Sequence, residues 1–248
     1  MAVTAELPRV ETYDYSLFGE VESKPLSRIR QVISKRLSAS WINVPHVAQF
    51  DEVDLTALEV LRQRLATKAQ DAGIKLTLLP FVMQACAHAL KAFPEFNASL
   101  DATGEILVLK KYCHIAFATE TPIGLLAPVV RDVDKKDLFE TANAINALAA
   151  KAKAGRLALS DAEGACFTVS NLGMLGGTSF IPVINAPEVG ILGVARASRK
   201  VVEVNGEFGS RLILPLSLVY DHRVIDGAVG GRFLALIRKQ LGEPDTLF

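Results

Sequence analysis

Residues 217–227 read Ser-Leu-Val-Tyr-Asp-His-Arg-Val-Ile-Asp-Gly, an apolar run that stops abruptly at ionisable side chains. The apolar part is typical of a buried β-strand, and the residues after Gly227 repeat their apolar positions with helical spacing. The polar residues therefore lie where a strand ends, which is where a site can open. His222 is the main candidate, because an imidazole with an unperturbed pKa of about 6.5 can exchange protons near neutral pH.

The same stretch also has a purely structural interpretation. A histidine at a strand end is often a hydrogen-bonded structural residue, and Asp226 stands where an N-cap would accept backbone N–H groups of the next helix. A zinc site of Asp221, His222 and Asp226 is conceivable from the residue types. It is disfavoured, because the spaced histidines or cysteines of most zinc enzymes are missing.

A second candidate is Ser170, which the run FTVSNLG at 167–173 delivers into a glycine-containing turn. The hydroxyl could act as a nucleophile, as an oxyanion donor or as a turn former, and the residues alone favour the turn former. The GxSxG elbow of serine hydrolases is missing around Ser170, so that class loses support. Phe180 is the aromatic residue of the following stretch GGTSF at 176–180, and ordinary core packing is its plain interpretation.

Apolar periodicity elsewhere predicts an α+β fold with a mixed β-sheet flanked by helices. We expect helices at 29–41, 58–69, 78–93, 138–154 and 228–241. We expect strands at 46–55, 105–109, 113–118, 125–130, 166–170, 189–194, 201–204 and 212–220. The strands come in hairpin-like groups rather than in strict βαβ alternation, which disfavours a doubly wound fold. Neither GxGxxG nor GxxxxGK[ST] is present, so Rossmann and P-loop nucleotide sites are disfavoured.

The domain organisation is simple. Residues 1–24 show no sustained period and are expected to form a linker end or an extended arm, whereas residues 25–248 are expected to form one catalytic domain.

Composition limits the classes of function. Of 248 residues, 50% are hydrophobic and 22% charged, as in soluble globular proteins. Lysine plus arginine (27) equals aspartate plus glutamate (27), so no global positive field attracts nucleic acid or anionic membranes. The three cysteines form no CxxC pair, and no secretion signal or run of roughly 20 apolar residues is found. We expect a protein of a reducing, aqueous compartment.

The motif at 221–227 matches the DHRxxDG signature of the dihydrolipoamide acyltransferases, the E2 components of 2-oxo acid dehydrogenase complexes. The chain resembles this family almost throughout, because four further blocks follow the family's order. These blocks are SRIRQVISKRLSASWINVPH at 27–46, the segment 115–130 with TPIGLLAPVV, FTVSNLG at 167–173 and INAPEVGILGV at 184–194. The last block, together with DHRVIDGA, is most similar to acetyl-transferring members of bacterial pyruvate dehydrogenase complexes.

The resemblance implies a chloramphenicol acetyltransferase-like fold and a trimer with active sites between subunits. Coenzyme A and the dihydrolipoyl group would enter each site from opposite ends. His222 would be the general base that removes a thiol proton, and Ser170 of a neighbouring subunit would donate to the oxyanion without being acylated. Asp226 would order the site or only cap the helix, and Phe180 would line the channel. No metal is expected.

The resemblance also implies partners. The lipoyl group is normally carried on an upstream domain that is absent here, so we expect a catalytic core that works with a lipoyl domain and with the E1 and E3 components. The bacterial acetyl-type sequence favours a cubic 24-mer of trimers over a 60-mer, in the cytoplasm. A succinyl- or branched-chain-specific member, a free-standing chloramphenicol-type acetyltransferase and a non-enzymatic scaffold stay open as alternatives.

Overall fold

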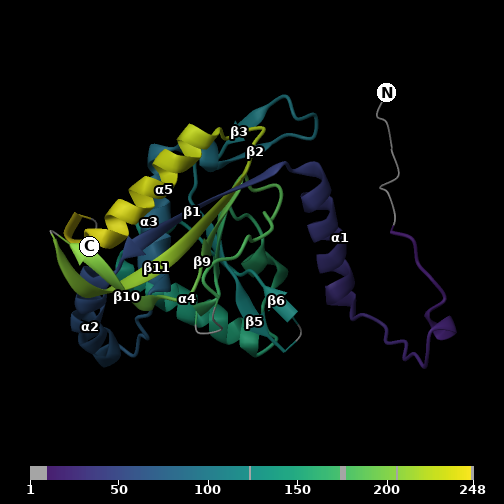
Figure 1. Ribbon diagram of the computed structural model, residues 1–248, viewed down its shortest axis with the longest axis horizontal. Coiled ribbons are helices and arrows are strands. Elements are labelled where there is room, and N and C mark those ends of the chain that lie inside the picture. The colour runs from purple at the N-terminus through teal and green to yellow at the C-terminus, as the bar shows by residue number, and fades with distance from the viewer. Residues whose placement is uncertain (1–9, 123, 174–176, 205, 247–248) are drawn as a thin grey trace.

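The computed structural model describes residues 10–122, 124–173, 177–204 and 206–246 (Figure 1). The expected arm at 1–24 therefore lies partly outside the described residues. Its described part, residues 10–24, is exposed and contains the 3₁₀ turn Tyr15–Leu17. Among the described residues, no helix has the length and apolar character needed to cross a membrane.

The centre of the molecule is a mixed seven-stranded sheet, as predicted. Its strands follow the order β1 (His46–Asp54), β11 (Glu207–Asp221), β9 (Gly190–Val194), β8 (Phe167–Asn171), β4 (Ile115–Phe117) and β7 (Val129–Val130), and β10 (Ser198–Val204) pairs with β11. Strands β4, β8 and β9 are parallel to one another, whereas β11 is antiparallel to β1, β9 and β10. Because β9 is antiparallel to β11, the carboxyl end of β11 lies beside the amino end of β9.

Two short hairpins lie outside this sheet. Strand β2 (Ala98–Leu100) pairs with β3 (Leu107–Leu109), and β5 (Thr119–Thr121) pairs with β6 (Gly124–Leu126). The sequence patterns predicted β3 and the run containing β6 and β7 but missed β2 and β5, because three residues are too few to show alternation.

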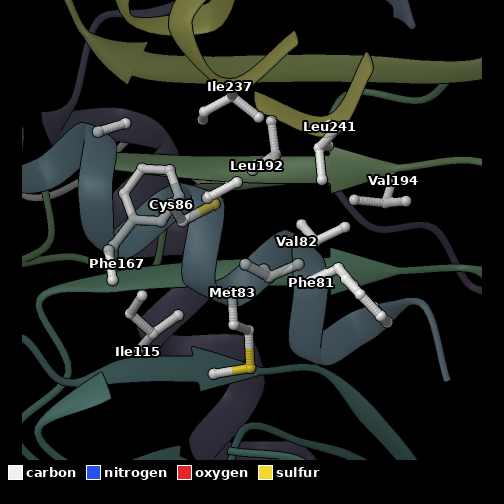
Figure 2. Close-up of a cluster of buried hydrophobic side chains, with 14 of the residues drawn as sticks. Phe81, Val82, Met83, Cys86, Ile115, Phe167, Leu192, Val194, Ile237 and Leu241 are labelled. Atoms are coloured by element: carbon white, nitrogen blue, oxygen red, sulfur yellow. The ribbon is translucent and has the colours of Figure 1, made fainter. Parts of the chain in front are cut away.

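The five predicted helices are all present. They are α1 (Arg28–Asn43), α2 (Thr56–Asp71), α3 (Leu79–Ala92), α4 (Leu138–Lys153) and α5 (Gly227–Gly242). Helix α3 is apolar nearly all round and is buried against the sheet and α5, as its sequence predicted. Figure 2 shows this core, in which side chains of α3, β4, β8, β9 and α5 meet; they include Phe81, Val82, Cys86, Ile115, Phe167, Leu192 and Ile237. The strands that carry the candidate site are thus fixed on a packed core.

Helix α1 is the exception to this packing. Its apolar side chains recur as predicted, but Trp41 is 58% exposed and Leu37 is 41% exposed. Ser40 is the one buried residue in the helix. Figure 1 shows α1 at the side of the molecule, away from α3 and α5. The apolar face of α1 therefore does not contribute to the core of its own chain.

Candidate active site

His222 lies at the carboxyl end of β11, where the sequence predicted an opening. Its side chain is exposed, and its backbone N–H donates to the Pro45 carbonyl oxygen over 3.0 Å. The preceding residue, Asp221, is buried and donates its backbone N–H to the Val189 carbonyl oxygen over 2.8 Å. The Asp221 carboxylate accepts hydrogen bonds from the Arg223 guanidinium, with Nε 3.0 Å from Oδ1 and Nη2 2.7 Å from Oδ2. The backbone around His222 is thus tied to the start of β1 and of β9.

Asp226 acts as the N-cap of α5. Its carboxylate accepts the backbone N–H groups of Ala228 and Val229, each at 2.9 Å. The pKa of Asp226 lies below its usual value, chiefly because of the hydrogen bond from Val229. Within the described ranges, no hydrogen bond joins its carboxylate to His222. The geometry therefore places Asp226 in its structural role, and any role in catalysis stays a prediction.

Ser170 lies near the carboxyl end of β8, half-buried, beside Gly193 of β9. A Cβ atom added at Gly193 would lie 3.0 Å from Cζ of Phe180 and 3.3 Å from Cδ of Pro182. The Phe180 ring therefore packs on Gly193, the residue paired with Ser170. The Gly176 end of the predicted glycine-rich stretch lies outside the described residues.

Ser170 and His222 do not meet within one chain. Ser170 pairs with Gly193, Gly193 pairs with Ser217, and His222 follows Ser217 by five residues along β11. At about 3.4 Å per strand residue, the two side chains are separated by roughly 17 Å along the sheet. The structure thus brings Ser170 together with Phe180, and His222 close to Asp226, but at opposite ends of the central strands.

A basic hollow lies beyond the carboxyl end of β9. It has a volume of about 540 Å³, and the described residues that line it include Arg196, Arg199 and Lys200 but no carboxylate side chain. Lys200 forms an ion pair with Glu52. Arg196 and Arg199 are exposed and have no ion pair among the residues described. The hollow therefore presents positive charge available to an anion.

Sequence reasoning missed Glu188, a carboxyl group that is only 4% exposed. It accepts hydrogen bonds from Oγ1 of Thr168 at 2.6 Å and from Nδ2 of Asn185 at 2.9 Å. Burial raises the pKa of Glu188 to about 7, against these two hydrogen bonds and the charge of Lys110, which lower it. The available signal was that Glu188 is the single charged residue in the run at 184–194.

The three cysteines, His46 and His114 have structural surroundings. Burial raises the pKa of Cys113 to about 12 and also raises the pKa values of Cys86 and Cys166, so these thiols stay protonated. The ring of His46 lies between the Val44 oxygen and the Ile184 N–H, while Nδ1 of His114 accepts the Asp132 N–H. In the described part of the chain, no cluster of three His, Cys, Asp or Glu residues could hold a metal ion.

Comparison with known proteins gives a consistent result. The model of the family 2-oxoacid dehydrogenases acyltransferase (catalytic domain) matches residues 18–248. A relative from Pseudomonas aeruginosa, the dihydrolipoyllysine-residue acetyltransferase component of the pyruvate dehydrogenase complex, is 50% identical over 243 residues. That match covers 98% of this chain but 44% of the relative, so the chain spans about half of the relative's length.

Comparison with solved structures points to the same family. The cubic core of a pyruvate dehydrogenase multienzyme complex and an Azotobacter vinelandii dihydrolipoamide acetyltransferase each match with a TM-score of 0.94 and 46% identity, over 97% of this chain and 99% of theirs. The Azotobacter structure belongs to an investigation of a serine, a histidine and an asparagine in that enzyme's catalytic mechanism. A chloramphenicol acetyltransferase matches with a TM-score of 0.52 and 18% identity over 86% of this chain and 94% of its own, which confirms the predicted fold.

Proposed function

This chain belongs to the 2-oxoacid dehydrogenase acyltransferase family, as its catalytic domain, and from that membership we infer that it transfers an acetyl group between coenzyme A and a dihydrolipoyl group. The main support is the 50% identity over 98% of the chain with an acetyltransferase component of a pyruvate dehydrogenase complex. Motif spacing supports the assignment too. The three residues studied in the Azotobacter enzyme have the same spacing as Ser170, His222 and Asp226, with asparagine in place of Asp226.

In the proposed reaction, the imidazole of His222 removes the proton from the acceptor thiol. A free thiol has a pKa of about 8.5 and is only slightly ionised at neutral pH, so a positioned base raises the reactive fraction. The thiolate attacks the thioester carbonyl carbon, and the resulting oxyanion accepts a hydrogen bond from the Ser170 hydroxyl. The intermediate then expels the second sulfur, which takes the proton from the His222 imidazolium. Ser170 forms no covalent bond in this sequence.

This mechanism requires two copies of the chain. The separation of roughly 17 Å between Ser170 and His222 is too large for both to act on one carbonyl group within a single copy. A site between neighbouring copies brings Ser170 of one next to His222 of the other. The exposed apolar face of α1 is a surface that such an assembly can bury, and on this proposal trimers build a cubic 24-mer core like that of the relative.

The basic hollow indicates how coenzyme A is oriented in the proposed site. Arg196 follows Gly193 by three residues, so the hollow begins roughly 10 Å beyond Ser170 along the strand direction. The thiol end of coenzyme A lies at Ser170, its arm runs along the Phe180 ring that covers Gly193, and its phosphate groups bind Arg196 and Arg199. Phe180 thereby serves as the channel lining that the sequence suggested.

The remaining parts of the proposal come from the longer relatives. Residues 25–248 form the catalytic domain, and the lipoyl domain lies in a part of the protein other than this chain. The E1 and E3 components are the further partners. Asp226 orders the turn around His222 through its cap on α5.

An acceptor and donor panel tests the function. Acetyl, succinyl and isobutyryl thioesters of coenzyme A are each assayed with dihydrolipoamide and with chloramphenicol as acceptors. We expect efficient transfer of acetyl to dihydrolipoamide, which a correctly assembled His222→Ala variant loses. Preference for succinyl or isobutyryl would reassign the acyl group. Use of the drug without the dithiol would favour the free-standing acetyltransferase, and undiminished transfer by His222→Ala would contradict the mechanism.

A further inference from the structure

The segment at 184–189, which leads into β9, is held by side chains from three other elements. The Ser40 hydroxyl of α1 donates to the Ile184 carbonyl oxygen. The backbone N–H of Ile184 donates to Nε2 of His46 in β1 over 3.1 Å. The Ser99 hydroxyl of β2 donates to the Pro187 carbonyl oxygen over 2.6 Å. The segment is therefore fixed at both of its ends.

Within this segment, the Glu188 carboxyl group binds the strand that carries Ser170. Its 2.6 Å hydrogen bond joins it to Thr168 of β8, which is itself buried. Thr168 precedes Ser170 by two residues, and residues two apart in a strand face the same side of the sheet. A shift of the Glu188–Thr168 pair would therefore move the Ser170 face of β8 directly.

The other end of the connection leads to His222. Val189, the residue after Glu188, accepts the Asp221 N–H over 2.8 Å, and Asp221 immediately precedes His222. Glu188 therefore lies one residue from the bond that anchors the His222 turn. One buried carboxyl group connects the strand of Ser170 with the turn of His222, although these two residues lie at opposite ends of the central strands.

We propose that Glu188 is a positioning residue for acyl transfer, which fixes the Ser170 strand and the His222 turn relative to each other. The inference rests on the proposed function. Glu188 touches neither reacting atom and acts through Thr168 and Val189. If its carboxyl group is removed, the Thr168 hydroxyl and the Asn185 amide lose their acceptor in a buried place, and the surrounding backbone must adjust to satisfy them.

The charged surroundings determine which form of Glu188 completes the network. Lys110 lies close enough to favour the ionised form, and the Cys166 thiol, itself protonated, also lies nearby. Both hydrogen-bonding neighbours donate, so the ionised carboxylate accepts both bonds, whereas the protonated group brings a third hydrogen. Since burial brings the pKa of Glu188 to about 7, both forms are present near neutral pH.

The test compares steady-state kinetics of the assembled wild type with those of Glu188→Ala, Glu188→Gln and Thr168→Val. Glu188→Ala and Thr168→Val should each lower kcat by roughly 10- to 100-fold, because a small misplacement of reacting groups is costly, with KM changing by less than about twofold. The double variant should be no slower than the slower single variant. Glu188→Gln should instead have the lowered kcat of the protonated enzyme, because its amide, like the carboxylic acid, brings hydrogen to a place where Thr168 and Asn185 both already donate.

Thr141→Val is the matched control. Thr141 of α4 is equally buried and its hydroxyl is bonded to Nε2 of Gln84 at 2.7 Å, remote from the candidate site. Its loss should lower stability but leave kcat unchanged. If Thr168→Val lowers kcat no more than Thr141→Val does, Glu188 has only a structural role and the proposal is overturned.

A pH profile separates positioning from general stability. The wild-type kcat should fall as Glu188 is protonated below pH of about 7, and the profile of Glu188→Gln should lack this fall. Infrared titration should show a carboxylic acid carbonyl band that Glu188→Gln lacks. Identical profiles, or a folded Glu188→Ala variant with unchanged kcat, would refute the inference. If Glu188→Ala fails to fold, the kinetics of Thr168→Val and Glu188→Gln test the role of Glu188 in its place. A wild type without acyl transfer would instead refute the proposed function.

Discussion

Ser170 and His222 lie at opposite ends of the same group of strands, because Ser170 is in register with Ser217 across β9 and His222 follows five residues later. Parallel β8 and β9 present Ser170 near their carboxyl ends, and antiparallel β11 brings His222 to their amino ends. The proposed mechanism therefore needs the serine of one copy and the histidine of another. This relationship can be tested directly in mixed assemblies.

Co-assembly of two impaired variants should restore activity. His222→Ala copies still supply Ser170, and Ser170→Ala copies still supply His222, so a mixed trimer contains some sites with both wild-type residues. The acyl transfer rate of co-expressed, co-purified mixtures should exceed the sum of the rates of the two separate variants at equal protein concentration. A mixture that shows only the weighted sum would place both residues in a site within one copy.

Removal of the Ser170 hydroxyl should impair the chemical step. We expect Ser170→Ala to lower kcat by roughly 10² to 10³, the usual loss for one oxyanion donor, with a modest change in KM. Ser210→Ala, at an exposed position of β11, is the control and should behave as wild type. Mass spectrometry after rapid quenching should find no acetyl group on Ser170; trapping one would mean that serine is a nucleophile.

The basic hollow should distinguish coenzyme A from its fragments. Arg196→Ala and Arg199→Ala should each raise KM for coenzyme A by roughly tenfold, the effect of losing one charge-assisted hydrogen bond, and leave KM for pantetheine unchanged. The effect should weaken at high salt. Arg64→Ala, an exposed arginine of α2 without an ion pair among the described residues, is the matched control. If either substitution raised KM equally for coenzyme A and for pantetheine, the phosphate groups of coenzyme A would bind outside the basic hollow.

The sequence predicted the helices well because their signals are local. The spacing of Ile29, Ile33, Leu37 and Trp41 marks α1 although no core packs on that face, and the apolar character of 78–93 marks the central helix α3. Periodicity identifies an amphipathic face but does not say what covers it. The exposure of Trp41 is therefore a result that only the three-dimensional structure supplies.

The candidate site was only partly predictable for a similar reason. Ser170 and His222 were found from residue type and motif, since each ends an apolar run. Their separation depends on strand register across β8, β9 and β11, which the sequence does not encode in any local pattern. Glu188 was missed because its hydrogen bond to Thr168 is a contact between two segments distant in the sequence. Each segment taken alone has the pattern of an ordinary strand or loop.

Glu188 should also make the stability of the fold depend on pH. Its pKa rises from 4.5 to about 7 on folding, so the folded state binds the proton more tightly than the unfolded state. The stabilisation from this group is fully present below pH 4.5 and is lost as the pH rises through 7, which amounts to on the order of 3 kcal/mol. Glu188→Gln cannot titrate and should lack this loss. The urea midpoints of wild type and Glu188→Gln, compared from pH 4 to pH 8 at one protein concentration, should therefore diverge as the pH rises, with the wild type losing stability relative to the variant. Parallel curves would show that the carboxyl group ionises at its ordinary pKa and is not buried as the structure has it.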